Sequence, residues 1–532
     1  MKHFITGRNL QVTFVLLSLF STLLYAFTTN HVWEDFYITF KHSKNLVDGN
    51  GLVYHPGEKV HGFTSVINTL LPALFYWITG KSLVLTIWLY RIASIAALIF
   101  GGLIFLREIQ RQYSQNLLIP LFFTLFFAFQ IKTIMFTTNG QEAGFMMLFL
   151  LPTIILAYNG FERNWKWLGL CWAGLIYTRP DGVAYILITT VAVILARQSY
   201  SKKELFAIFK AGSLCAIIYL PWFIGVWLYY GTPVPHTITA KSGIGGINFT
   251  NDLVFSFEKI IGNLPHVGKQ ISLPTYYHFG AWPYWIKVYG FCSWLLCSIY
   301  WLIPSPDKFG RFISLTYTFV ILYLSFLQTI GLVYPWYFPP AEMLAAFILC
   351  SAIYHIANHF TKNSKIPVYI ASTLMLYIFS NVYFMSLNQI KVQQEVIETN
   401  HRKEIGLWLN KNKQDNDTVF LEPLGYIGFY SNATMLDWPG LVAPKVVAAE
   451  QNKKAGHFSN LILKLKPSWV VIRPYVQMQL RQLQSFNESY ELVKVFNALN
   501  ELKPYANLPG INYLYYDSVF YIYKQKKAIS PS

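Results

Sequence analysis

The chain has 532 residues, of which 54% are hydrophobic and only 13% are charged. Soluble globular proteins carry about 25% charged residues, so this composition excludes a single soluble domain, and it also excludes an intrinsically disordered chain. The net charge of +17 contains no long basic run, and cytoplasmic loops of membrane proteins collect Lys and Arg. The sequence therefore predicts a polytopic protein of the lipid bilayer, with no nucleic-acid partner.

The first apolar stretch, residues 12–27, follows a basic N-terminus that contains Lys2 and Arg8. Because no small-residue cleavage motif comes after it, we expect an uncleaved first helix and not a signal peptide. The five cysteines all lie in apolar stretches and have no partner at metal-ligand spacing. They therefore predict buried small side chains, and neither a disulfide framework nor a zinc ribbon.

Twelve apolar segments follow one another along the first 386 residues. They are residues 11–29, 66–80, 83–106, 117–136, 143–159, 168–178, 182–196, 206–228, 286–303, 312–333, 340–358 and 367–386. Crossing a bilayer takes about 20 residues of helix, so residues 168–178 and 182–196 are short for this purpose.

The distribution of Lys and Arg among the loops favours eleven crossings, with residues 66–80 lying along the membrane surface. The loops that then share a side with the N-terminus are 107–116, 160–167, 197–205, 304–311 and 359–366. These loops contain Arg107, Arg111, Arg163, Lys166, Arg197, Lys202, Lys203, Lys308, Arg311, Lys362 and Lys365, whereas residues 137–142 and 334–339 contain no Lys or Arg. By the positive-inside rule, the N-terminus is cytoplasmic and the C-terminus lies on the other side.

The composition changes near residue 387, where polar residues return. Strand-like runs cover residues 418–422, 469–472 and 513–523, and a helical pattern covers 404–411. Alternating helices and strands predict a small α/β domain. We therefore expect a transmembrane domain over residues 1–386 and an extracytoplasmic α/β domain over 387–532.

Two adjacent carboxylates, Glu34 and Asp35, follow the first apolar segment directly. They are interpreted either as ordinary charges at the membrane surface or as functional groups. A carboxylate at this boundary is suited to act as a general base for a lipid-linked reaction, or to bind a divalent cation. The loop that follows, residues 30–65, is too rich in polar residues, Gly and Pro to be a simple connector.

This loop resembles the first external loop of bacterial GT-C glycosyltransferases, in particular the group that includes the mycobacterial terminal arabinofuranosyltransferases. The resemblance rests on Glu34-Asp35, Lys41, Gly49-Asn50-Gly51-Leu52-Val53, Pro56-Gly57-Glu58 and Gly62-Phe63-Thr64-Ser65. The family pattern is an acidic pair, an Arg-Tyr-Ala run, a Gly-x-Gly-Leu-Val turn and Pro-Gly-Glu-x-Val-Glu-Gly-Tyr-Thr-Ser.

Further motifs follow in the family order up to about residue 445. They are Asn139-Gly140-Gln141-Glu142, Thr178-Arg179-Pro180-Asp181-Gly182, Tyr229-Tyr230-Gly231 with Pro235-His236-Thr237 and Ala240-Lys241, Gly425-Tyr426-Ile427-Gly428-Phe429-Tyr430-Ser431, and Leu436-Asp437 with Gly440-Leu441. The sequence also departs from the pattern. Lys41 replaces an Arg, His61 replaces a Glu and His236 replaces an Asn, and Lys lacks the two-pronged geometry of Arg.

The resemblance implies an enzyme of the bacterial inner membrane that moves a sugar from a polyprenyl-phosphate donor to a cell-envelope acceptor, with inversion. It implies Asp35 or Glu34 as the catalytic base. The residues that it implies for binding the donor phosphate or the substrate are Lys41, Glu58, His61, Glu142, Arg179, His236 and Lys241. It requires no cofactor, and a divalent cation is a further candidate. Glu142, Arg179 and Lys241 also have ordinary interpretations, as helix caps, a tight turn and a solvated loop charge.

A secondary transporter or a flippase for lipid-linked sugars is the alternative function. Such proteins carry ionisable residues inside their spans and often contain inverted repeats. The predicted spans contain few charges, with Arg91 and Glu342 as exceptions, and no repeat is visible. In the predicted C-terminal domain, Tyr426, Tyr430, Asp437 and Trp438 are expected either to face the active site or to hold the domain together.

Overall fold

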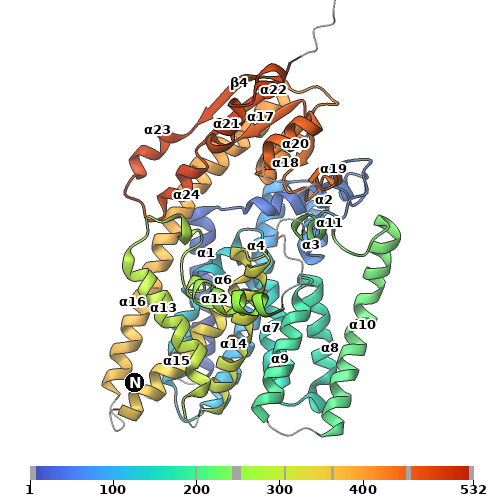
Figure 1. The fold of residues 1–532 in the computed structure, drawn as a ribbon. Coiled ribbons are helices and arrows are strands. Elements are labelled where there is room, and N and C mark those ends of the chain that lie inside the picture. The colour runs from blue at the N-terminus through green and yellow to red at the C-terminus, as the bar shows by residue number, and fades with distance from the viewer. Residues whose placement is uncertain are drawn as a thin grey trace, which may run out of the picture.

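A bundle of long helices carries a small sheet domain at one end (Figure 1). The computed structural model describes residues 7–197, 201–242, 253–304, 307–360, 365–450 and 457–526. Among these residues, six helices are long and apolar enough to cross a membrane, or seven if one bent pair is a single span. They are α1 (Gly7–Thr29), α4 (Leu83–Gln112), α10 (Lys202–Tyr230), α14 (Lys308–Thr329), α15 (Pro339–Phe360), α16 (Ile366–Val392) and the pair α5 (Leu118–Phe127) and α6 (Ile131–Thr138).

Four shorter helices complete the eleven segments that were expected to cross. They are α7 (Ala143–Tyr158), α8 (Phe161–Thr178), α9 (Gly182–Arg197) and α13 (Tyr284–Ile299). Helix α8 begins well before the predicted apolar segment, so Arg163 and Lys166 lie on its first two turns and not in a loop. A further helix, α12 (Leu253–Gln270), was not predicted; it is amphipathic and contains Glu258, Lys259 and Lys269.

The basic loops gather at one end of the bundle. The Gln110 side chain there bonds the carbonyl oxygen of Gly7 at 3.0 Å, and Arg111 bonds both Glu108 and Asn159. Arg197 bonds the carbonyl oxygen of Tyr158. The N-terminus lies at this end, opposite the sheet domain (Figure 1). Within the described residues, the structure therefore groups the Lys- and Arg-rich loops with the N-terminal end, as the loop charges predict. Lys362, which the prediction also used, lies outside the described residues.

Helix α3 (Ile67–Ile78) begins and ends at the opposite end of the bundle. At its start, the Val66 N–H donates to the carbonyl oxygen of Tyr177, near the end of α8. Just after it, Lys81 forms an ion pair of 2.6 Å with Asp48, which follows α2 (Glu34–Val47). This is the arrangement expected for a segment that does not cross. Helix α2 itself is a correction, because no helix was predicted in the loop over 30–65.

The chain enters the sheet domain without a break. Helix α16 continues into a π-helical segment, η4 (Gln393–Arg402), and then into α17 (Lys403–Asn412). The change of composition near residue 387 is therefore a change of surroundings along one helical rod of 47 residues. This rod connects the bundle directly to the core of the sheet domain.

The sheet has five strands in the order β2-β1-β3-β5-β4. They are β1 (Thr418–Leu421), β2 (Thr434–Asp437), β3 (Trp469–Ile472), β4 (Tyr490–Asn497) and β5 (Val519–Gln525). Strand β1 is parallel to β2 and β3, whereas β5 is antiparallel to β3 and β4. The third predicted strand is partly wrong, since α24 (Ile511–Tyr516) precedes β5, and β2 and β4 were not predicted.

Short helices connect these strands. They are α18 (Leu424–Ser431), α19 (Pro444–Glu450), α20 (His457–Leu465), α21 (Pro474–Arg481), α22 (Gln484–Ser489) and α23 (Leu499–Leu502). Helix α18 packs against α17 and α2. The domain therefore rests on the segment that contains Glu34 and Asp35.

We expect a topology reporter placed after Gly80 to report the extracytoplasmic side, and one placed after Gln112 to report the cytoplasm. The reason is that α3 does not cross and the basic loops lie with the N-terminus. Paired phosphatase and fluorescent-protein fusions measure this. A cytoplasmic signal at Gly80 together with an external signal at Gln112 would contradict the orientation.

Candidate active site

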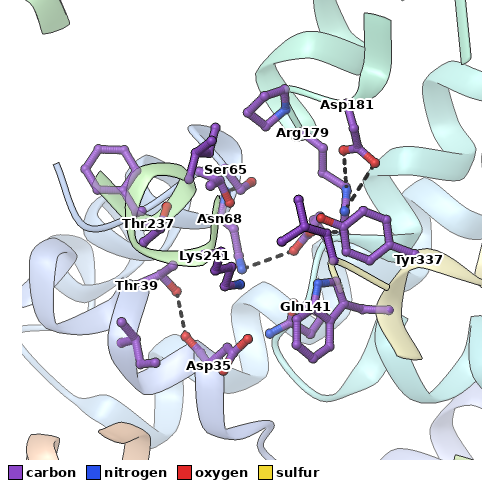
Figure 2. A pocket seen from close by; sticks show the side chains of 18 of the residues that line it. Asp35, Thr39, Ser65, Asn68, Gln141, Arg179, Asp181, Thr237, Lys241 and Tyr337 are labelled. Carbon is purple, nitrogen blue, oxygen red and sulfur yellow. Dashed lines mark hydrogen bonds and ion pairs between the residues drawn. The ribbon is translucent and has the colours of Figure 1, made fainter. Parts of the chain in front are cut away.

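A cavity of about 240 Å³ lies at the end of the bundle that faces the sheet domain. Its walls come from segments far apart in the chain (Figure 2). They include Asp35 of α2, Asn68 of α3, Glu142 before α7, Arg179 after α8, Lys241 of α11 (His236–Ser242), Trp336 and Tyr337 of η3 (Pro335–Tyr337), and Leu441 of the sheet domain. The fold therefore brings together four of the predicted site residues, namely Asp35, Glu142, Arg179 and Lys241.

The two adjacent carboxylates of α2 point to different places. Neighbouring residues on a helix do not share a face, and only Asp35 lines the cavity. Glu34 instead pairs with Arg402 of η4 at 2.7 Å and accepts the Gly425 N–H at 3.1 Å. Asp35 is therefore the carboxylate that faces the cavity, and Glu34 faces the sheet domain.

Burial raises the pKa of Asp35 to about 6. Lys241 opposes this shift, whereas the negative charges of Glu34 and Glu142 add to it. Removal from water disfavours the ionised form of any carboxyl group. A carboxylate with a pKa near 6 is ionised at neutral pH and is still basic enough to take a proton.

Lys241 is a cation of the cavity that influences Asp35 but forms no ion pair with a carboxylate of the described residues. Its ammonium group lies 4.5 Å from the ring centroid of Tyr334 and 5.8 Å from that of Trp336. Among the described residues, no carboxylate oxygen lies within 4.0 Å of Lys241 Nζ. Burial lowers the pKa of Lys241, and the charge of Asp35 opposes this effect. The aromatic rings and Asp35 together keep the ammonium group inside the cavity.

Arg179 is held rigidly where α8 ends. Its Nε and Nη2 bond the carboxylate of Asp181 at 2.7 and 3.2 Å, and its Nη1 bonds Glu142 at 3.0 Å. Its guanidinium also lies 4.0 Å from the ring centroid of Tyr337. Arg179 and Asp181 therefore form part of a tight turn, because Asp181 fixes the arginine. The guanidinium of Arg179 faces the cavity in an orientation that these contacts determine.

Four other predicted site residues do not line this cavity, and their roles in substrate binding stay predictions. Lys41 is buried against the ring of Tyr54 and donates to the Gly428 carbonyl oxygen at 3.1 Å. Burial lowers the pKa of Lys41 to about 7. Through the bond to Gly428, Lys41 attaches α2 to the sheet domain.

The other three lie in or beside the loop that follows α2. The His61 ring stacks on Tyr230 at 4.8 Å, and its carbonyl oxygen accepts the N–H of His236 at 2.8 Å. Burial lowers the pKa of His61 to about 4, so the ring is neutral at neutral pH. His236 is half-buried where α11 begins, and Glu58 is exposed. The two histidines orient α11, which carries Lys241, and Glu58 faces solvent.

The residues of the sheet domain near the cavity mostly form hydrogen bonds that fix neighbouring residues. Tyr426 donates to the Val32 carbonyl oxygen at 3.0 Å, and Tyr430 lies 3.4 Å from the Tyr37 hydroxyl. Asp437 accepts the N–H of Leu441 at 2.6 Å and thereby places Leu441 in the cavity wall. Trp438 bonds Glu450 and does not line the cavity.

Several cavity residues were not predicted, including Asn68, Trp336 and Tyr337. The run Tyr334-Pro335-Trp336-Tyr337 carries a signal that was available, since Trp and Tyr concentrate at membrane interfaces. Nothing near Asn68 in the sequence indicates that its amide lies 3.5 Å from Glu142. That contact follows only from the way α3 packs.

The described residues do not fit a divalent-cation site. No group of three or more His, Cys, Asp or Glu side chains among them is placed to hold a metal ion. Glu142 and Asp181 both direct their carboxylates at Arg179. Among the described carboxylates that line the cavity, Asp35 is then the one that is not paired with Arg179.

A second cavity, of about 260 Å³, lies on the other side of η3 and is lined in part by Lys132, His266 and His278. Lys132 bonds the carbonyl oxygens of Gln270 and Ile271 at the end of α12. Charges at helix ends stabilise the helix dipole. Lys132, the buried lysine of this second cavity, therefore caps the C-terminal end of α12.

The chain resembles the GT-C glycosyltransferases, as its motifs predict. A 24% identity over 239 residues relates it to the terminal beta-(1->2)-arabinofuranosyltransferase of Mycobacterium tuberculosis; this match covers 40% of the chain and 35% of the relative. The chain thus spans well under half the length of this curated relative. Residues 388–522 match a family described as a domain of unknown function, DUF8728.

Two solved structures are similar to the whole chain. ArnT from Cupriavidus metallidurans bound to undecaprenyl phosphate is 12% identical, with a TM-score of 0.51, over 98% of this chain and 99% of that one. The arabinofuranosyltransferase AftD from mycobacteria is 13% identical, with a TM-score of 0.46, over 99% of this chain and 40% of that one. The likeness to ArnT shows a common fold. It confirms the predicted class, a multi-pass helical membrane protein with a C-terminal sheet domain.

We expect Asp35→Asn to leave thermal stability unchanged or higher at neutral pH. The folded state raises the pKa of Asp35 from its usual value of about 4 to about 6, so its stability contribution is lost as pH rises through that window. The amide removes this cost. Thermal unfolding of detergent-purified protein, followed by tryptophan fluorescence, measures the effect.

Asp437→Asn is the matched control. Burial raises the pKa of Asp437 to about 6 as well, but its two oxygens accept the N–H groups of Leu441 and Val442. An amide accepts with only one of its two groups, so we expect this variant to unfold at a lower temperature. Equal destabilisation by both substitutions would show that Asp35 is a structural carboxylate.

Proposed function

We propose that the protein is a membrane glycosyltransferase that moves a sugar from a polyprenyl-phosphate donor to a cell-envelope acceptor at the extracytoplasmic face. The observation that carries this proposal is one cavity in which Asp35 faces Lys241 and Arg179. Two cations suit a phosphate, and a nearby carboxylate suits a hydroxyl that must lose a proton. The acceptor is a glycan, a lipid or a protein.

The position of the cavity supports the lipid-linked donor. It lies at the end of the bundle opposite the basic loops, where a phosphate on a membrane-embedded chain meets water. The structure of ArnT, which has this fold, was solved with undecaprenyl phosphate bound. The mycobacterial relative is named as a transferase of arabinofuranose. The ligand of ArnT supports a polyprenyl phosphate as the carrier of the donor, and the name of the mycobacterial relative supports the transfer of a sugar.

The reaction proceeds in one displacement. Lys241 and Arg179 hold the donor phosphate, and Asp35 accepts the proton of the acceptor hydroxyl as its oxygen attacks the anomeric carbon. The bond between that carbon and the phosphate oxygen breaks, and the polyprenyl phosphate leaves with the electron pair. A single displacement inverts the anomeric centre. No second carboxylic acid is needed because phosphate leaves without being protonated.

The charges inside the bundle support an enzyme better than a transporter. Arg91 is fully buried and donates to the carbonyl oxygens of Thr138 and His31 and to the side chain of Asn30. Glu342 accepts N–H groups at the start of α6. Each of these charges fixes backbone near the cavity, whereas a transport pathway needs ionisable groups that a substrate can reach.

We expect purified wild-type protein in liposomes to transfer label from a polyprenyl-phosphate sugar to an envelope glycan acceptor. Asp35→Asn should lower transfer by about 10²- to 10⁴-fold, the contribution of a general base. Wild-type transfer should also fall about tenfold per pH unit below the pKa of Asp35, which is about 6. Undiminished transfer by the variant would contradict the proposal. Movement of the intact lipid-linked sugar across the liposome without transfer would establish the flippase alternative.

We expect Lys241→Ala to weaken donor binding by at least about tenfold, because charge-assisted bonds to phosphate contribute about 1.5–3 kcal/mol each. Lys241→Arg should retain most of the binding. The measurement is binding of a fluorescent polyprenyl phosphate in nanodiscs. Lys59→Ala is the control, since Lys59 is exposed beside Tyr229, outside the cavity. Equal loss in both lysine variants would indicate a nonspecific charge effect.

A further inference from the structure

The segment that leads into Asp35 is fastened by the sheet domain and the rod below it. Gln394 of η4 accepts the Val32 N–H at 3.1 Å with its side-chain oxygen, and the same oxygen lies 2.9 Å from the His31 ring. Tyr426 of α18 bonds both Val32 and Gln394. The short link between α1 and α2 is therefore held by the rod and the sheet domain as well as by Arg91 of the bundle.

The first turn of α2 is then held through Glu34. One carboxylate oxygen pairs with Arg402 at 2.7 Å, and the other accepts the Gly425 N–H at 3.1 Å. The contact is close, because a Cβ on Gly425 would meet the Glu34 backbone at 2.2 Å. No side chain larger than glycine fits there without moving α2 or α18. The domain thus contacts Glu34, the residue directly before Asp35, through the charged side chain of Arg402 and through the backbone of Gly425.

Arg402 is anchored independently of Glu34. It is fully buried and also pairs with Glu398 at 3.0 Å and with Asp517 at 2.5 Å. Asp517 is shared with Arg473 at 2.6 Å. The five fixed donors of a guanidinium allow Arg402 to bond three carboxylates at once, which an ammonium group cannot do with the same geometry.

Arg402 lies in the π-helical segment of the rod. Residues 393–402 form η4. Its Gln394 and Arg402 side chains contact residues at the start of α2, and its Glu398 pairs with Arg402. Departures from α-helical geometry of this kind often occur at functional sites. The segment where the rod leaves the bundle therefore places the contacts that hold α2.

We infer that Arg402 is a positioning residue, which holds Glu34 against the sheet domain so that Asp35 alone faces the cavity. The inference rests on the proposed role of Asp35 as the base. It assigns a function to the domain of residues 388–522, namely setting the orientation of the catalytic turn. It also explains why two acidic residues are adjacent here, since Asp35 acts as the base and Glu34 fixes the orientation of the helix turn.

The charge of Glu34 also affects Asp35, which provides a specific readout. The titratable and charged groups that face Asp35 are Glu34 of its own helix, Lys241 of α11, Glu142 before α7, Arg179 and Asp181 of the α8–α9 turn, and Tyr334 and Tyr337 around η3. Removing the Glu34 charge lowers the pKa of Asp35. Releasing Glu34 from Arg402 lets that charge approach Asp35 and raises the pKa.

The test uses the full-length protein and measures the protonation of Asp35 without relying on activity. Dicyclohexylcarbodiimide modifies protonated carboxyl groups, and mass spectrometry of the Asp35 peptide gives the pH midpoint of labelling. We expect Glu34→Gln to shift this midpoint down by about one pH unit and Arg402→Lys to shift it up by a similar amount. Transfer should fall about ten- to a hundredfold in both variants, as expected for a misplaced catalytic group.

A double variant and a matched control complete the experiment. If Arg402 acts through Glu34, adding Arg402→Lys to Glu34→Gln should lower transfer by less than about twofold more. Arg473→Lys is the control, because Arg473 shares Asp517 but does not touch Glu34. We expect it to lower stability while the labelling midpoint and the transfer rate stay within error of wild type.

The possible results separate the two proposals. Midpoints that move in opposite directions support the positioning role, even if no donor is transferred by the wild type, in which case only the proposed function fails. Unchanged midpoints and rates in Glu34→Gln and Arg402→Lys overturn the positioning role. It is also overturned if both variants and Arg473→Lys change together, since that would indicate a general loosening of the domain.

Discussion

One carboxylate, Asp35, which faces a cavity at the end of the helix bundle, is surrounded by elements from both parts of the protein. Asp35 is buried enough that its pKa rises to about 6, yet it faces Lys241 in the same cavity. Burying a charge is costly unless it is paired. The protein reduces this cost by placing cations on separate elements around the cavity, and it keeps the carboxylate from moving by attaching its helix to a second domain.

The same constraint explains the sheet domain and the helical rod. Helix α2, of 14 residues, packs against α3 at the bundle end and against α18 of the sheet domain. It is held by Arg402 through Glu34, by Gln394 through Val32, and by Lys41 through the Gly428 carbonyl oxygen. The rod continues from the bundle into the domain. These contacts therefore fix the position of α2 relative to the helices of the bundle. The domain therefore acts on the cavity chiefly by holding it.

Much of the fold followed from hydropathy and loop charge. Ten of the eleven predicted crossings each contain one main helix and the other contains the bent pair α5 and α6, because a lipid-facing segment must satisfy its own backbone hydrogen bonds. The early start of α8 was missed because Arg163 and Lys166 lie on a helix that extends beyond the apolar stretch. Helix α2 was not predicted because it is followed directly by a stretch rich in Gly and Pro, which indicates turns.

The site was predicted less completely, for geometrical reasons. The sequence places Glu34 beside Asp35 and cannot show that the helix turns them to different sides. Lys41, His61 and Glu58 occupy motif positions, although Lys41 and His61 replace the residues of the family. Lys41 is buried against Tyr54, His61 stacks on Tyr230 and Glu58 is exposed, and none of them lines the cavity. Asn68 and Tyr337 reach the cavity by long-range packing that no local pattern encodes.

The most direct test of the account is a cryo-electron microscopy structure of the protein in nanodiscs with bound polyprenyl phosphate. We expect the phosphate oxygens to lie within hydrogen-bond distance of Lys241 Nζ and Arg179, with the carboxylate of Asp35 facing the same space. A phosphate bound in the second cavity against Lys132, or at the end of the bundle that carries the basic loops, would contradict the assignment of this cavity as the active site.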